Sequence, residues 1–189
     1  IITCHIGNGA SLAAVKDGKC VNTSMGFTPL AGVMMGTRSG DIDPAIVTYL
    51  AAKLNKSADD VMNILNKKSG LLGVSGISSD ARDIVNGCKE GNELALLARK
   101  MHVNTVANFV GQYFVELGGC DAMVFTAGLG ENDVEFRAEL CEKLSGALGI
   151  ELDPVANNHR GQELLVSTPN SKIKVFVIPT NEEIVIARD

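Results

Sequence analysis

One arginine, Arg38, stands in an irregular segment, residues 25–44, which carries four glycines and no helical or strand periodicity. Its neighbours are small and flexible: Thr37, Ser39 and Gly40. A guanidinium donates hydrogen bonds from a planar fork, which suits a phosphoryl group or a carboxylate ligand. The alternative is a structural ion pair with Asp41 or Asp43, and spacing alone does not decide between the two.

The turn Gly7-Asn8-Gly9 has the composition of a phosphate-binding loop. Paired glycines let backbone N–H groups approach an anion closely, and the side chains of His5 and Asn8 could add donors. The alternative is a plain hairpin turn, with His5 a buried histidine that takes no part in binding.

A second glycine turn, Gly128-Leu129-Gly130-Glu131-Asn132, follows an uncharged strand-like segment and precedes a helical one. Strand, glycine turn and helix N-terminus form the nucleotide-binding arrangement of doubly wound sheets. The turn lacks the third glycine of the GxGxxG pattern and the lysine of a Walker A loop. It indicates nucleotide binding without matching either fingerprint.

Two further groups of charged residues lie at expected helix starts. Asp80 and Arg82 flank Ala81, and they could be a capping carboxylate and a surface arginine as well as ligands. Glu182 follows the end of an expected strand, where a carboxylate can reach a metal ion. It can equally be only a partner of the helix dipole.

The elements that must position these residues follow an α/β order. Apolar periodicity and turn residues predict strands over residues 1–6, 11–16, 19–23, 122–127 and 172–178. Caps and helical periodicity predict helices over residues 44–54, 57–67, from 81, 92–117 and 133–148. The chain therefore opens as a three-stranded antiparallel meander and continues with βαβα elements. A helical insertion lies between the third strand and the long helix, and residues 69–80 are expected to form a loop.

Composition excludes several classes of protein. The net charge of −5 comes with no basic cluster, so no nucleic-acid surface is expected. No apolar run reaches the roughly 20 residues that span a bilayer. The five cysteines are scattered without CxxC spacing, which favours a reducing cytosol. The chain starts in a strand without an initiator Met and ends in an apparent helix, so both ends look cut from something longer.

Taken in order, these motifs resemble the acetate kinase family along the entire chain, in the part that corresponds to its C-terminal lobe. The motifs are residues 5–9 (HIGNG), 35–44 (MGTRSGDIDP), 78–82 (SSDAR), 125–132 (FTAGLGEN) and 179–183 (PTNEE). The resemblance implies the fold of actin, the heat-shock ATPases and the sugar kinases, which is ribonuclease H-like. It also implies that residues 1–189 form one nucleotide-binding lobe.

The resemblance further implies reversible phosphoryl transfer from ATP to acetate, giving acetyl phosphate and ADP. Arg38 would stabilise the phosphoryl group in the transition state of its transfer, and Glu182 would contribute to the Mg²⁺ or Mn²⁺ site. Ala81 stands where the family commonly has a larger residue, which bears on nucleotide selectivity. The nucleotide-binding residues would be His5, Ile6, Gly7, Asn8, Gly9, Asp80, Ala81, Arg82, Gly128, Leu129, Gly130, Glu131 and Asn132.

The family's N-terminal lobe, with its share of the active site, has no counterpart in this sequence. We therefore expect the isolated chain to be inactive and the whole protein to be a homodimer joined through this lobe. Two alternatives stay open: a propionate or butyrate kinase relative, and a non-catalytic module for nucleotide binding and dimerisation.

Overall fold

The computed structural model describes residues 1–181, 184 and 188. The chain divides into two compact units. The first comprises Ile1–Gly7, Ala13–Asn22 and Gly111–Asp189, and the second comprises Asn8–Leu12 and Thr23–Val110. Most of the sheet lies in the first unit, and the segment of Arg38 lies in the second.

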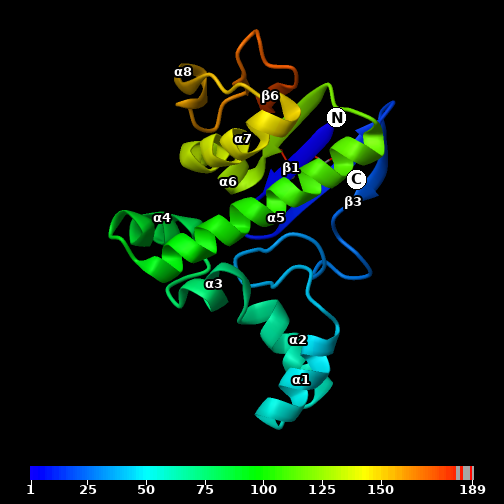
Figure 1. The fold of residues 1–189 in the computed structure, drawn as a ribbon, viewed down its shortest axis with the longest axis vertical. Coiled ribbons are helices and arrows are strands. Elements are labelled where there is room, and N and C mark those ends of the chain that lie inside the picture. The colour runs from blue at the N-terminus through cyan, green and yellow to red at the C-terminus, as the bar shows by residue number, and fades with distance from the viewer. Residues whose placement is uncertain (182–183, 185–187, 189) are drawn as a thin grey trace. The chain divides into compact units, whose positions relative to one another are not determined.

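The sheet has six strands in the order β3-β2-β1-β4-β6-β5 (Figure 1). β1 pairs in parallel with β4, β4 pairs in parallel with β6, and β5 pairs antiparallel with β6. The two-residue turn between β2 and β3 makes these neighbours antiparallel, as expected for the opening meander. The bounds are Ile2–Ile6 (β1), Ala10–Lys16 (β2), Lys19–Thr23 (β3), Ala122–Thr126 (β4), Leu164–Leu165 (β5) and Lys174–Val177 (β6).

Central β4 shows why these residues form a sheet of this kind. It carries no charge, and its side chains at Met123 and Phe125 are fully or almost fully buried. In β1, alternate side chains are buried in the same way, at Ile2, Cys4 and Ile6. The sequence-based prediction of an uncharged central strand is confirmed.

The helices match the expected order and add three short ones. The bounds are Ala45–Leu54 (α1), Ala58–Lys67 (α2), Gly70–Ser75 (α3), Ala81–Lys89 (α4), Glu93–Leu117 (α5), Ala127–Asn132 (α6), Val134–Leu148 (α7) and Pro154–Asn157 (α8). The helices α3, α6 and α8 were not predicted. α3 lies where a loop was expected, and α6 occupies the second glycine turn itself.

In the second unit, α1 and α2 pack beside each other in the expected helical insertion (Figure 1). Their shared core is built on Leu30, Val61 and Leu65, with Val47 and Leu50 packed against it. The predicted capping box opens α2, with the Ser57 side chain accepting from the Asp60 N–H and the Asp60 side chain accepting in return.

The segment before α1 has neither helix nor strand, yet it is packed. Val33 and Met35 are fully buried and Met34 is nearly so. An irregular backbone that is buried must find hydrogen bonds elsewhere. These hydrogen bonds fix the backbone on either side of Arg38.

In the first unit, α7 turns an apolar face inward through Phe136, Leu140, Leu144 and Leu148. Among the described residues, no helix is both long and apolar enough to cross a membrane.

Candidate functional site

The backbone around Arg38 is clamped by the end of α2 and the start of α3. Ser39 N donates to Leu65 O at 2.9 Å, and Ser69 N donates to Thr37 O at 2.9 Å. Met35 O accepts from Leu71 N, also at 2.9 Å. Three donors and acceptors from outside the loop therefore hold the residues on either side of Arg38, so its backbone position is set by the fold.

The Arg38 side chain is partly exposed and only lightly bonded. Its Nη1 donates to Pro29 O at 3.5 Å, at the long limit for a hydrogen bond, and to the weak acceptor Met35 Sδ at 3.4 Å. The carboxylates of Asp41 and Asp43 instead accept from the backbone N–H groups of Gly32 and Ala45. Neither carboxylate therefore forms the structural ion pair with Arg38 that the sequence left open.

The first glycine turn meets the Arg38 loop within the second unit. Gly36 N donates to Asn8 O at 3.3 Å. A Cβ placed on Gly9 would lie 3.6 Å from Arg38 Nη1, in ordinary contact. Asn8 and Gly9 are both exposed, so their backbone groups are accessible beside the guanidinium.

Gly36 lets a third segment approach the same place. A Cβ on Gly36 would overlap Asn8 Oδ1 and would lie 2.8 Å from Ser79 O, closer than real Cβ atoms come. Only a residue without a side chain allows these segments to meet here. The turn, the Arg38 loop and the segment before Asp80 are therefore neighbours, which spacing in the sequence does not reveal.

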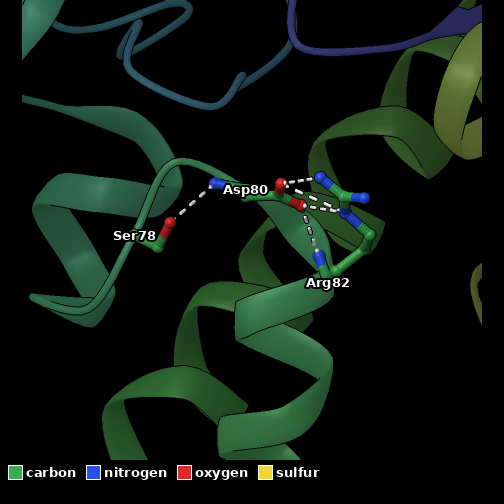
Figure 2. Close-up of polar contacts among 3 residues, drawn as sticks. All are labelled: Ser78, Asp80 and Arg82. Carbon is green, nitrogen blue, oxygen red and sulfur yellow. Dashed lines mark hydrogen bonds and ion pairs between the residues drawn. The ribbon is translucent and has the colours of Figure 1, made fainter.

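Asp80 and Arg82 form a compact ion pair at the start of α4 (Figure 2). Arg82 Nε donates to both Asp80 carboxylate oxygens, at 3.0 and 3.1 Å, and Arg82 N donates to Oδ1 at 2.9 Å. These hydrogen bonds lower the pKa of Asp80 from 3.8 to about 2 and raise the pKa of Arg82. Asp80 is thus the helix cap that the sequence allowed, and Arg82, whose side chain is 88% exposed, is accessible to a ligand.

In the first unit, parallel pairing brings three sequence motifs to one edge of the sheet. His5 of β1 stands opposite Thr126 of β4, and Phe125 stands opposite Val177 of β6. The carboxyl ends of parallel strands meet at the same edge, which is where open α/β sheets bind ligands. The residues that follow these ends include Gly7, Gly128 and Thr180.

The second glycine turn departs sharply from the strand before it. Ala127 has a φ of 64°, a left-handed conformation that residues with a side chain rarely adopt. Gly128 is exposed, and a Cβ placed on it would meet nothing within 4 Å. Asn132 Nδ2 donates back to Gly128 O at 2.9 Å. The backbone at the start of the turn is therefore exposed, and the hydrogen bond from Asn132 to Gly128 O stabilises the turn.

Glu131 ties this turn to the segment that precedes the predicted metal ligand. Its Oε1 accepts from Thr180 N at 3.0 Å. Glu182 itself lies outside the described residues. Among the residues that are described, no group of three or more His, Cys, Asp or Glu side chains could hold a metal ion.

A family model described as the acetokinase family matches residues 1–188. The chain belongs to the acetokinase family. It is 58% identical over 189 residues to the acetate kinase of Clostridium novyi (strain NT), covering 100% of this chain and 47% of that protein. It is 54% identical to the acetate kinase of Bacillus subtilis (strain 168), covering 100% of this chain and 48% of that protein. The chain spans about half the length of the curated relatives it matches.

Solved structures of the acetokinase family agree on the fold. The crystal structure of Porphyromonas gingivalis acetate kinase matches with a TM-score of 0.95 and 48% identity, over 100% of this chain and 47% of that one. A propionate kinase from Francisella tularensis subsp. tularensis SCHU S4 matches with a TM-score of 0.92 and 43% identity, over 99% and 47%. The predicted resemblance and the actin, heat-shock ATPase and sugar-kinase fold are confirmed.

Proposed function

We propose that this acetokinase-family chain forms the nucleotide-binding lobe of an acetate kinase and supplies its catalytic arginine. The reaction would transfer the γ-phosphoryl group of ATP to acetate, giving acetyl phosphate and ADP, and would be reversible. The observation that supports this most directly is the partly exposed Arg38 guanidinium beside the backbone of Gly9, in a loop held by α2 and α3.

The proposed step needs charge stabilisation rather than a strong base. A carboxylate oxygen of acetate attacks the γ-phosphorus in line, the bond from phosphorus to the bridging oxygen breaks, and ADP leaves with that electron pair. Acetate is already ionised at neutral pH, so no proton has to be removed. Negative charge spreads over the equatorial oxygens, and Arg38 would donate hydrogen bonds to them.

The nucleotide contacts proposed from the family pattern form two groups, and each group has support within its own unit. In the second unit, exposed Asn8 and Gly9 would face the phosphates, and Asp80 to Arg82 would line the adenosine. In the first unit, residues 5–7 and 128–132 follow or end neighbouring parallel strands at the ligand-binding edge of the sheet.

A divalent cation, Mg²⁺ or Mn²⁺, would neutralise charge on the phosphate oxygens when bound. Magnesium sites in nucleotide enzymes use one or two carboxylates and complete the coordination with phosphates and water. Glu182, which lies outside the described residues, is the carboxylate proposed for this role.

The proposal includes a second lobe, a second copy of the chain and a compartment. Because the chain covers about half of its relatives, we propose that an N-terminal lobe completes the active site. Half-exposed apolar side chains along α5 support a homodimer: Leu94, Leu96, Leu97 and Met101. All five cysteines are free thiols, in keeping with a cytoplasmic protein.

The test compares Arg38→Ala and Arg38→Lys in the full-length protein. Because the guanidinium would act on the transition state, we expect Arg38→Ala to lower kcat by about 10³-fold or more while KM for ATP changes little. Lysine keeps the charge without the planar fork, so Arg38→Lys should recover only part of the rate. An unchanged kcat in Arg38→Ala would return Arg38 to a structural role.

Two further assays distinguish the alternatives. The isolated 189-residue chain is expected to show no turnover of acetyl phosphate, and measurable turnover would contradict the proposed division of the active site. Propionate kinase is the specific alternative, because one matching structure bears that name. Rates for acetate, propionate and butyrate with the full-length protein decide between them.

A further inference from the structure

Arg137, in the second turn of α7, is a charged residue with no exposed surface. It lies on the same helical face as the buried residues Leu140, Cys141 and Leu144. A cation on an apolar face is costly to bury unless its donors are all used. The sequence motifs assign no role to it.

The guanidinium makes five hydrogen bonds, and each acceptor is an uncharged oxygen. Nη1 donates to the carbonyls of Gly130 and Glu131, at 3.0 and 2.9 Å. Nε donates to Asn157 Oδ1 at 2.7 Å, and Nη2 donates to the carbonyls of Asn157 and His159, both at 2.8 Å. One side chain thus joins the second glycine turn to residues 157–159.

The far side of this connection is itself well anchored. Asn157 is 2% exposed, and its Nδ2 donates to Val134 O at 3.0 Å. Gly161 N donates to Glu131 O at 3.2 Å, which is a second tie between the same two segments. The polar stretch around α8 therefore serves as a support for α6.

The turn needs such a support for two reasons. α6 has only six residues, too few to be stable alone, and it starts from Ala127 in a left-handed conformation. A strained backbone of this kind persists only where its surroundings hold it, and such positions cluster at ligand sites. Arg137 fixes the carbonyl end of α6, opposite the open backbone at Gly128.

We propose that Arg137 is a positioning residue for an adenine nucleotide. It holds α6 against residues 157–159 and so fixes the backbone of residues 128–132 that would face the nucleotide. This inference rests on the proposed nucleotide-binding function of that turn. The fork and not only the charge is required, because the five acceptors lie in divergent directions that one ammonium group does not span.

The test measures local order and ligand affinity separately in the full-length protein. The variants are Arg137→Met and Arg137→Lys, with Lys143→Met as the matched control at an exposed site on the same helix. Hydrogen exchange read by mass spectrometry reports on residues 127–133 and 157–161 without nucleotide. Titration calorimetry with ADP and Mg²⁺ reports affinity.

Both Arg137 variants should exchange about tenfold faster or more in these two segments, while α1 and α2 keep their protection. Both should bind ADP roughly tenfold more weakly than the unsubstituted protein, and Lys143→Met should match it in both measurements. If Arg137→Met does not fold, Asn157→Ala is the second variant. It removes one acceptor of Arg137 and the bond to Val134 O, leaves the four bonds from Arg137 to carbonyl groups in place, and should show the same local effect in smaller degree.

Three results would overturn the proposal. One is unchanged exchange in residues 127–133 of a folded Arg137 variant, and another is unchanged ADP affinity in that variant. The third is wild-type behaviour of Arg137→Lys, which would mean that charge alone suffices. If the unsubstituted full-length protein binds no ADP, the proposed nucleotide function fails, whereas the exchange data still decide whether Arg137 holds the turn.

Discussion

Gly70 offers the most direct test of how the Arg38 loop is held. It begins α3 with a φ of +62°, and a Cβ placed on it would overlap Met35 O. The same Cβ would lie 2.7 Å from Arg38 O and 3.1 Å from Arg38 N. At the other end of α3, Gly76 has a φ of +68° with nothing within 4 Å of its Cβ position. The variants Gly70→Ala and Gly76→Ala therefore differ mainly in that only the first places a methyl group against the Arg38 loop.

The expected magnitudes follow from this difference. A left-handed alanine costs about 1–2 kcal/mol, and that cost is common to Gly70→Ala and Gly76→Ala. The lower entropy of the unfolded chain is also common to both. Only Gly70→Ala adds overpacking against backbone atoms, which costs about 1–3 kcal/mol in a packed region. The difference in the free energy of unfolding between the two variants should therefore be about 1–3 kcal/mol.

Urea unfolding of the 189-residue chain, followed by circular dichroism, measures this difference. In the full-length protein, Gly70→Ala should also lower kcat more than Gly76→Ala, because the displaced backbone carries Arg38. Equal stability of the two variants would refute the reasoning that α3 clamps the Arg38 loop through a close approach at Gly70.

Two further predictions concern the second glycine turn and the Asp80 cap. Gly128→Ala should leave the melting temperature unchanged or raise it, since a Cβ at this position meets nothing within 4 Å. The same variant should bind ADP roughly tenfold more weakly, because the added methyl group enters the open side of the turn. Gly146→Ala, in α7 and equally unobstructed, is the control and should bind ADP normally in calorimetry; equal affinities would refute a ligand at Gly128. The pKa of Asp80 is depressed to about 2, so the charged carboxylate stabilises the folded state above pH 4. This contribution to stability is lost as the pH falls through 2. Asp80→Asn keeps a capping side chain, so its destabilisation should be less than about 1 kcal/mol at pH 7, given the exposed Arg82. In thermal unfolding this difference should be mostly lost at pH 2, where the carboxyl group is about half protonated in the folded state. A difference at pH 2 as large as the one at pH 7 would refute the ion pair as its cause.

Much of the fold could be predicted because its signals are local. The uncharged segment at β4 predicts a central strand, and Ser57 with Asp60 predicts the start of α2 from neighbouring residues alone. The order of the motifs was specific enough to indicate the family, which the comparisons confirm. The individual site residues stay predictions, because each role depends on a ligand.

Some errors arose where local signals pointed the wrong way. Glycine and serine around Gly70 predicted a loop, yet α3 forms there because Gly70 fits against the carbonyl of Met35. Residues 128–132 were expected to form a turn between a strand and a helix, yet residues 127–132 themselves form a short helix. In both places tertiary contacts outweigh the low helix propensity of glycine.

The sequence by itself determined the order of the longer strands and helices, the capping box of α2 and the family, since these depend on residues close together in the chain. Only the tertiary structure decided which residues converge: Gly36 with Asn8 and Ser79, and Arg137 with Asn157 and Glu131. Such contacts join residues that are many positions apart, and they depend on the absence of a side chain or on complete burial of a charge. Neither property is visible in the residue type, because the sequence does not distinguish a buried arginine from an exposed one, or a tightly packed glycine from one on the surface.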